Sequence, residues 1–222
     1  PTEFVRRKFI EAGFPKGKIV VKPHFMFPDP GFCKLVKRYA VFVGQLAEKK
    51  GVHILLRAWE HINLPLKIIG DGPLQKYVES YVYERGLSDR VELLGRRSLT
   101  EVIRVLKHAM FLILPSLHHE GFPRVIVESF ACGVPVLASD LEPLNELVEH
   151  QRTGLLFPKG NPEAIKTAVV EVTRDTKLLW EMKGYARKEF EAKYTAEANY
   201  MQLIEIYNRA IKIYKNHKRR HQ

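Results

Sequence analysis

The stretch RVIVESFACGVPVLAS, residues 124–139, decides the fold because it joins an apolar helical segment to an apolar, β-branched run. Pro123 directly before it suits the first position of a helix, where its missing N–H would have no partner in any case. Gly133 is the expected end of that helix, and VPVLAS (134–139) is predicted to be a strand covered on both faces. A helix leading into a buried strand is one unit of an α/β protein.

The same alternation extends through the chain in both directions. Short β-branched runs predict further strands at 40–44, 66–70, 90–95 and 111–116. Segments of helical period predict helices at 52–62, 73–86, 98–109, 144–150, 161–172 and from about 176 to 215. Ser98 and Glu101 predict a capping box at the start of the third of these. We therefore expect an α/β fold, a Rossmann-like doubly wound parallel sheet of about six strands with helices on both faces and a long C-terminal helix.

The two ends of the chain differ from this body. The first 35 residues predict a helix at 2–13, a short strand at 18–22 and then an irregular proline-rich stretch. We accordingly divide the chain into a lead-in segment, a body, and a C-terminal helix with a basic tail, at 1–38, 39–195 and 196–222. The terminal helix carries an apolar stripe that, if exposed, favours dimerisation or poor solubility, formed by Tyr200, Leu203, Ile204, Tyr207, Ile211 and Tyr214.

The composition excludes several classes of protein. The 222 residues are 45% hydrophobic and 27% charged, which suits a globular chain with a sizeable core rather than a disordered one. The longest apolar run, at 110–117, is too short to cross a bilayer, and the two cysteines suit a reducing compartment. The net charge of +11 favours an anionic partner such as phosphate, lipid headgroups or nucleic acid, although a solvated basic face explains it equally well.

Parallel α/β sheets bind ligands at the carboxyl ends of their strands, and the loops there are predicted at 44–51, 70–73, 95–98, 115–123 and 139–143. Three of them begin with glycine, at Gly44, Gly70 and Gly95, which allows close approach of a ligand but is also what a tight turn needs. The sequence has no G-x-G-x-x-G motif and no G-x-x-x-x-G-K-[ST] phosphate loop. No platform of basic and aromatic residues for nucleic acid is evident either, so we expect no nucleic-acid partner.

Two carboxylates flank the start of the helix after Pro123. Glu128 lies within an apolar segment, and a buried carboxylate needs hydrogen-bond donors. A sugar diol offers two hydroxyl donors together, and the first N–H groups of a helix favour an anion such as phosphate. A nucleotide sugar would satisfy both demands, with its ribose at Glu128, its phosphates at the helix start and its sugar at Glu120. The spacing is equally compatible with Glu128 paired to a nearby Arg or Lys and with Glu120 exposed on a loop.

The HHE run at 118–120 does not predict a metal site, because adjacent histidines point to different sides of a chain. We expect no metal.

The stretch EGFPRVIVESFACGVPVLASD (120–140) resembles the signature of glycosyltransferase family 4, the group 1 glycosyltransferases. That pattern has two glutamates separated by seven residues, followed by a small-Gly-x-Pro-Val strand. Other segments resemble the family in order and spacing, at 42–51 (FVGQLAEKKG), 68–73 (IIGDGP), 91–95 (VELLG) and 153–165 (TGLLFPKGNPEAI). The resemblance covers about residues 40 to 195. It implies one half of a GT-B fold and a retaining, metal-independent hexosyltransferase.

The resemblance also implies roles for individual residues. Glu128 would bind the ribose hydroxyls, Glu120 would face the donor sugar near the reacting carbon, and Lys50 would neutralise the diphosphate, which makes Glu120 and Lys50 the predicted catalytic pair. The loop at Gly95 and Arg96 would contact the base. The predicted donor-binding set comprises Gly44, Gln45, Lys50, Gly70, Asp71, Gly72, Gly95, Arg96, Glu120, Gly121, Phe122, Pro123, Arg124, Val125 and Glu128.

The sequence departs from the family pattern at two places. Gln45 stands where the family usually has an arginine that contacts the phosphates, so one charge is missing unless a nearby arginine replaces it, at Arg96, Arg97 or Arg124. The loop DLEPLNE (140–146) stands where the family is often glycine-rich, so that Glu142 and Pro143 would alter the pocket. Glu146 within it matches a frequent family glutamate, although helix capping also explains it.

A GT-B enzyme has two Rossmann-like domains, and 222 residues have room for one. We expect the C-terminal, donor-binding domain of an enzyme that moves a hexose from a nucleoside diphosphate sugar, most often a UDP-sugar, to a saccharide or lipid-linked acceptor. Without its N-terminal acceptor domain it is expected to be inactive. The alternative is a non-catalytic nucleotide-binding or regulatory module, best supported by Gln45. The expected location is the cytoplasm, with peripheral contact to the anionic inner face of a membrane as a further option.

Overall fold

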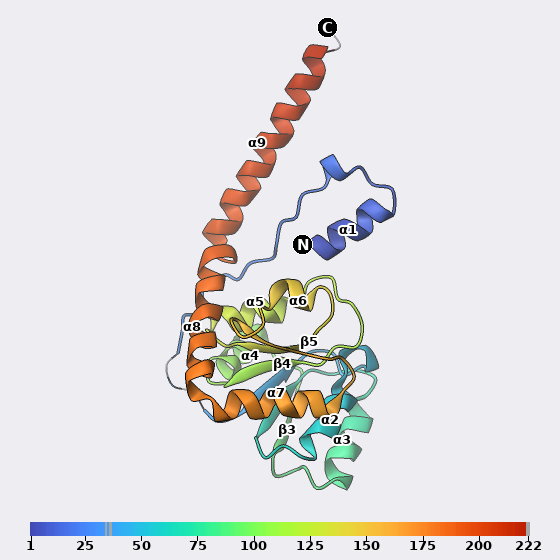
Figure 1. Cartoon of the computed structure of the whole chain (residues 1–222), viewed down its shortest axis with the longest axis vertical. Helices are drawn as coiled ribbons and strands as arrows, with labels where there is room; N and C mark the ends of the chain where they lie inside the picture. Colours follow the sequence, from blue (N-terminus) through green and yellow to red (C-terminus); the bar gives the residue numbers. More distant parts are fainter. Residues whose placement is uncertain (34, 36, 221–222) are drawn as a thin grey trace.

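The computed structural model describes residues 1–33, 35 and 37–220. Its centre is one sheet of six parallel strands in the order β3-β2-β1-β4-β5-β6 (Figure 1). The strands are β1 (Ala40–Val43), β2 (Leu66–Ile69), β3 (Val91–Gly95), β4 (Phe111–Leu114), β5 (Val136–Ser139) and β6 (Gly154–Phe157). The predicted α/β fold is confirmed, and the sixth strand comes from the TGLLF segment.

Helices cover both faces of the sheet, as apolar parallel strands require. One face is covered by α2 (Val52–Trp59), α3 (Gln75–Glu84) and α7 (Pro162–Arg174), and the other by α4 (Leu99–Leu106), α5 (Arg124–Ala131) and α6 (Leu144–Leu147). The long helix α8 (Thr176–Lys193) contributes to both cores. Its Leu179 and Met182 belong to the first core, and its Ala186 and Phe190 to the second.

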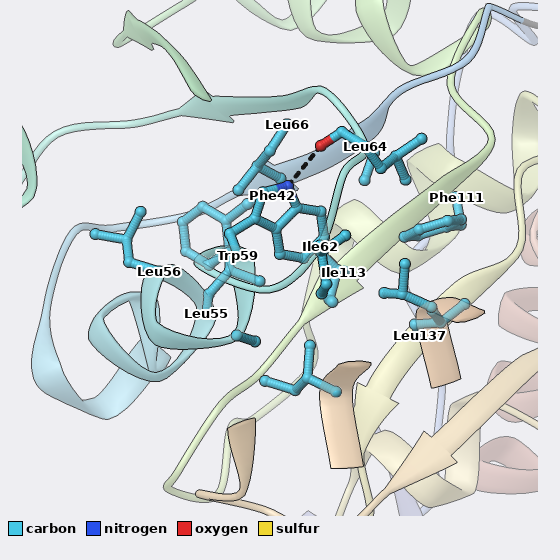
Figure 2. Packing of buried hydrophobic residues seen from close by; sticks show 14 of the residues in the cluster. Phe42, Leu55, Leu56, Trp59, Ile62, Leu64, Leu66, Phe111, Ile113 and Leu137 are labelled. Atoms are coloured by element: carbon cyan, nitrogen blue, oxygen red, sulfur yellow. Dashed lines mark hydrogen bonds between the residues drawn. The ribbon is translucent and has the colours of Figure 1, made fainter. Parts of the chain in front are cut away.

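The core of the first face is built around Trp59, which is fully buried at the end of α2. Figure 2 shows Trp59 among Phe42 of β1, Leu55 of its own helix and Leu66 of β2. Its indole N–H donates to the carbonyl of Leu64 at 2.7 Å, so the polar group of this large side chain is satisfied inside the core. This packing fixes α2 and, with it, the loop that leads from β1 into α2.

Local signals in the sequence set several helix boundaries. The N–H of Ser98 donates to the Glu101 carboxylate at 3.0 Å and the Ser98 hydroxyl accepts from the Glu101 N–H, which is the predicted capping box of α4. Helix α5 begins immediately after Pro123 and ends before Gly133, whose φ is +65°. The ring of Phe32 lies against Gly133 and leaves no room there for a side chain.

The structure differs from the sequence predictions in two connecting regions. The predicted strand at 18–22 is wrong: Lys16–Lys18 form a short 3-10 helix, and residues 19–22 have no strand partner, without which an extended run does not become part of a sheet. The helix predicted from about 176 to 215 is two helices, α8 and α9 (Ala196–Arg220). They separate because Thr195 caps α9, accepting from the N–H of Ala198 at 3.1 Å.

Two segments lie outside the sheet body. Helix α1 (Glu3–Glu11) lies above α5 and α6 in Figure 1, and α9 extends away from the body. The chain that follows α1 is tied to the start of α9, because Lys22 Nζ lies 2.5 Å from Asn199 Oδ1 and Asn199 Nδ2 donates to the carbonyl of Pro23 at 2.9 Å. Much of the apolar stripe on α9 is exposed, at Tyr200, Tyr207, Ile211 and Tyr214. None of the described helices combines the length and apolar character needed to span a membrane.

Candidate active site

The strand order reverses between β1 and β4, which pair in the middle of the sheet. In open α/β sheets, such a reversal is where ligands bind, outside the carboxyl ends of the strands. The loops that follow these two strands, at 44–51 and 115–123, contain both predicted catalytic residues.

Backbone contacts hold these two loops together. The N–H of Leu117 donates to the carbonyl of Lys49 at 2.9 Å. Gly51 has a φ of +69°, and a Cβ at this position would lie 1.9 Å from the carbonyl oxygen of Pro115. Only glycine satisfies both the backbone conformation and the available space. The Lys-Gly pair at 50–51 is therefore what allows the β1 loop to lie against the β4 loop.

The two predicted catalytic residues meet where these loops touch. Lys50 Nζ lies 2.5 Å from one carboxylate oxygen of Glu120, and Ser116 Oγ donates to the other oxygen at 2.5 Å. The Glu120 side chain is only 13% exposed, so the ion pair is partly shielded from water. Sequence analysis misses Ser116. The signal available for it was a serine directly after a buried strand, four residues ahead of the first family glutamate.

A hollow of about 290 Å³ opens beside this pair, lined by Lys49, Lys50, His118, His119, Glu120 and Gly121. Its two lysines suit an anionic ligand. His119 is occupied elsewhere, since its Nδ1 lies 2.7 Å from the carbonyl of Glu142 and its ring stacks on Phe4 with the centroids 4.9 Å apart. In the part of the chain that the structure describes, no group of three or more His, Cys, Asp or Glu side chains could hold a metal ion.

Glu128 lies on α5 and is partly buried. Burial raises the pKa of its carboxyl group, and the positive charge of Arg124, one turn earlier, opposes this shift. Among the side chains that the structure describes, at 1–33, 35 and 37–216, its carboxylate has no cation within 4.0 Å. The second reading that the spacing left open, with Glu128 paired to a nearby Arg or Lys and Glu120 exposed on a loop, is therefore not what the described side chains show, since Glu128 forms no ion pair among them and Glu120 is paired with Lys50.

The chain between the two glutamates forms the start of α5. The carbonyl of Gly121 accepts from the Thr2 hydroxyl at 3.2 Å, and the ring of Phe122 meets His24 edge-on with the centroids 4.9 Å apart. The start of α5 therefore lies beside Glu120 and in contact with the N-terminal segment. The remaining predicted residues here differ in exposure: Pro123 is buried, Arg124 is exposed and Val125 is half-buried.

The loops after β1 and β2 are packed through glycine. A Cβ at Gly70 would lie 1.9 Å from the carbonyl oxygen of Gly44, and one at Gly72 would lie 2.6 Å from the carbonyl oxygen of Leu46. The N–H of Leu46 donates to the carbonyl of Asp71 at 2.7 Å, while the Asp71 side chain is exposed. These predicted site residues lie at the ligand-binding edge, and their glycines are also required by the packing of the loops on each other.

The loop after β3 is open by comparison. Gly95 ends β3 with a φ of +64°, and nothing lies within 4 Å of the position that its Cβ would take. Gln45 and Arg96 are both exposed. No contact among the described residues joins Arg96 to the pair of Lys50 and Glu120, so the structure does not bring this predicted residue to the centre of the site.

The loop at 140–146, where the sequence departs from the family, receives the N-terminal helix. Arg7 forms ion pairs with Glu142 and, at 3.0 Å, with Glu146. The N–H of Phe4 donates to the second oxygen of Glu146 at 3.1 Å. Glu146 therefore interacts with the start of α1 rather than capping its own helix, and α1 is fixed close to the hollow beside Glu120.

Comparison with known proteins assigns the class. Residues 33–189 match the family described as Glycosyl transferases group 1. An uncharacterised glycosyltransferase of Methanocaldococcus jannaschii is 38% identical over 76% of this chain and 47% of its own length. The amylovoran biosynthesis glycosyltransferase of Erwinia amylovora is 28% identical over 92% of this chain and 54% of its own length. Fold and matches together define a glycosyltransferase domain. The chain belongs to the group 1 glycosyltransferases, as the sequence resemblance predicts.

Solved structures show the same fold. The Anabaena protein HepE, in complex with UDP-glucose, aligns with a TM-score of 0.83 at 22% identity, over 93% of this chain and 62% of that one. The apo form of the lipopolysaccharide outer core galactosyltransferase WaaB aligns with a TM-score of 0.73 at 21% identity, over 95% and 60% of the two chains. The fold corresponds to one half of a GT-B structure. The chain spans about half the length of the curated relatives it matches.

Proposed function

We propose that this chain is the donor-binding half of a retaining glycosyltransferase that moves a hexose from a nucleoside diphosphate sugar, most often a UDP-sugar, to a saccharide or lipid-linked acceptor. The observation that carries the proposal is the pair of Lys50 and Glu120 at the reversal of strand order, with Glu128 left without a cation on the adjoining helix. A cation, a sugar-facing carboxylate and a second, partly buried carboxylate that is not held in an ion pair suit a diphosphate sugar.

Each part of such a donor finds a suitable group. The ribose diol donates two hydrogen bonds to Glu128, which offsets the cost of burying that carboxylate. The diphosphate accepts from Lys50 and from the N–H groups at the start of α5, where the helix dipole favours negative charge by about 0.3–1 kcal/mol. The donor sugar lies at Glu120, and the exposed loop at Gly95 and Arg96 contacts the base, largely through main-chain groups.

The chemistry is electrostatic. Negative charge grows on the leaving diphosphate as the bond between sugar and phosphate breaks, and a preplaced lysine with helix N–H groups stabilises it. The partner of Lys50 in this structure is Glu120, so donor binding exchanges one anion for another at the lysine. No step in this scheme needs a metal.

In this proposal the body at 39–195 binds the donor and an N-terminal domain recognises the acceptor, with 1–38 as the lead-in segment and 196–222 as the C-terminal helix and basic tail. The comparisons support this division, because this chain aligns with only about half the length of the two curated relatives. The UDP-glucose bound by HepE supports a UDP-sugar as donor. We place the reaction in the cytoplasm, and the net charge of +11 suits contact with an anionic membrane surface.

The direct test is a thermal-shift panel with UDP, GDP, dTDP and ADP. A ligand at 100 times its dissociation constant adds about 2.7 kcal/mol to the free energy of unfolding, which raises the melting temperature by several degrees. We expect a shift with one nucleotide of the panel, and UDP is the first candidate. A panel without any shift would contradict the proposal.

A non-catalytic nucleotide-binding or regulatory module is the second candidate, because the exposed Gln45 supplies no charge where the family usually has an arginine. Such a module would shift with UDP and yet transfer no hexose after the chain is joined to an N-terminal acceptor domain. Transfer by the joined protein favours the first candidate, and binding without transfer favours the second.

A further inference from the structure

We propose that Ser116 is a positioning residue that holds one carboxylate oxygen of Glu120, so that the other oxygen becomes free for the donor sugar when the diphosphate takes over Lys50. The inference rests on the proposed function and assigns a role within the same site to a residue that neither the sequence pattern nor the comparisons identify.

The geometry separates the two oxygens of Glu120. One accepts from Ser116 Oγ and the other from Lys50 Nζ, each at 2.5 Å. A carboxylate that accepts from two donors on different oxygens has its orientation fixed by both. Loss of either donor releases one oxygen while the other still holds the carboxylate in place.

The two donors differ in their freedom to leave. Ser116 is 1% exposed and directly follows Pro115 at the end of β4, while the next residue, Leu117, is bonded through its N–H to Lys49. Its hydroxyl therefore has little room to move. The Lys50 side chain is 25% exposed and lines the hollow of about 290 Å³. Lys50 is the donor that an incoming anion can attract, and Ser116 is the one that stays.

Ser129 shows what a purely structural buried serine looks like in this chain. It is fully buried on α5, and its hydroxyl donates to the carbonyl of Val134 at 2.9 Å, a neutral bond between a helix and the strand entry after it. Ser116 differs because its acceptor is the carboxylate predicted to face the donor sugar. Ser129→Ala is thus a matched control for loss of one buried serine hydroxyl.

The test measures the dissociation constants of UDP and of a UDP-hexose by calorimetry for the unsubstituted chain, Ser116→Ala, Ser116→Cys and Ser129→Ala. The UDP-hexose used is the one in a panel of UDP-hexoses that the unsubstituted chain binds. We expect Ser116→Ala to weaken binding of the UDP-hexose about tenfold while leaving UDP within about twofold, because only the sugar contact depends on how Glu120 is held. Ser116→Cys fills nearly the same space with a weak donor, so it should show the same pattern even if Ser116→Ala folds poorly.

The ratio of the two constants distinguishes positioning from structural support. Ser129→Ala should lower the melting temperature and leave the ratio unchanged. Equal weakening of UDP and the UDP-hexose by the Ser116 variants, or no change in either, overturns the inference while the proposed function stands. Failure of the unsubstituted chain to bind any nucleotide overturns the proposed function and this inference with it.

Discussion

The loops after β1 and β4 and the loop after β3 lie along the same edge of the sheet but are built differently. Gly51 and Gly95 have almost the same φ, at +69° and +64°. Gly51 is in contact with the carbonyl of Pro115, whereas the space around Gly95 is open. The inner loops also share the pair of Lys50 and Glu120.

This difference suits two different roles along the edge of the sheet, one for the inner loops and one for the loop after β3. Under the proposed function, Lys50 and Glu120 act on the bond being broken and need a fixed geometry, which the backbone contacts at the reversal of strand order provide. Groups that hold the distal base tolerate more freedom, which suits the exposed loop after β3. Substitutions at matched positions in the two regions test whether this division is real.

The largest expected effect comes from adding one methyl group to each glycine. Gly51→Ala should reduce the free energy of unfolding by at least about 3 kcal/mol, because an unfavourable backbone conformation is combined with collision against the Pro115 carbonyl. Gly95→Ala should cost only about 1–2 kcal/mol, since the conformation alone is penalised. Urea denaturation measures both values. Equal costs would mean that the inner loops are no more tightly packed than the outer one.

A smaller effect is expected on the affinity for UDP when a charged side chain is removed from either region. Lys50→Ala should raise the dissociation constant for UDP about 10- to 30-fold, because the diphosphate loses its cation and meets the uncompensated charge of Glu120. Arg96→Ala should raise it less than about threefold, since this exposed side chain is screened by water. Calorimetry measures both.

Lys49→Ala is the matched control for Lys50→Ala, because Lys49 lines the same hollow and its backbone carbonyl, which the substitution keeps, accepts the hydrogen bond from Leu117 of the β4 loop. A loss of UDP affinity as large in Lys49→Ala as in Lys50→Ala would show that general positive charge, rather than the placed lysine, binds the diphosphate.

The smallest expected effect is a dependence on pH. Burial raises the pKa of Glu128, so the folded state holds this proton more tightly than the unfolded state, and stability falls as pH rises through the interval between the two pKa values. Glu128→Gln removes this cost and should be more stable than the unsubstituted chain at pH 7.5. The advantage should disappear below about pH 4, where the carboxyl group is protonated in both states. Chemical denaturation at several pH values provides the measurement.

Glu101, in the first turn of α4 after the β3 loop, is expected to make stability depend on pH in the opposite direction. The Ser98 hydroxyl and N–H lower the pKa of Glu101, so its contribution is present at neutral pH and lost as the carboxylate is protonated. Glu101→Gln should therefore be less stable than the unsubstituted chain at neutral pH and equal to it in acid. If the stability differences of Glu128→Gln and Glu101→Gln from the unsubstituted chain changed in the same direction with pH, the pKa shifts assigned to Glu128 and Glu101 would be refuted.

Most of the fold follows from the sequence because apolar runs of strand length alternate with amphipathic segments, and each helix cap is a local signal. Ser98 with Glu101 and the Pro123 boundary of α5 are examples. The strand predicted from KIVVK at 18–22 is wrong because strand formation depends on a partner elsewhere in the chain, which no local pattern reports. The break between α8 and α9 depends on one threonine cap inside a segment that is otherwise helical throughout.

The candidate site was predictable as a set of residues but not as a set of contacts. The spacing and the family resemblance point to Lys50, Glu120 and Glu128, yet only the fold shows that Lys50 pairs with Glu120 and that, among the described side chains, Glu128 forms no ion pair. Ser116 escaped prediction because a serine at a strand end is common and acquires meaning only from its acceptor. The contact between α1 and Glu146 joins residues too distant in sequence for any pattern to reveal.

The touching backbones of Gly44 and Gly70 have a consequence for the history of such chains. A descendant that had lost its substrate altogether would still have to retain Gly70, because a methyl group there would collide with the carbonyl of Gly44. Glycines of this kind record the ancestry of the sheet, not the survival of its chemistry. A lineage that abandons sugar transfer should instead accumulate substitutions at Lys50, Glu120 and Glu128, whose side chains belong to neither hydrophobic core.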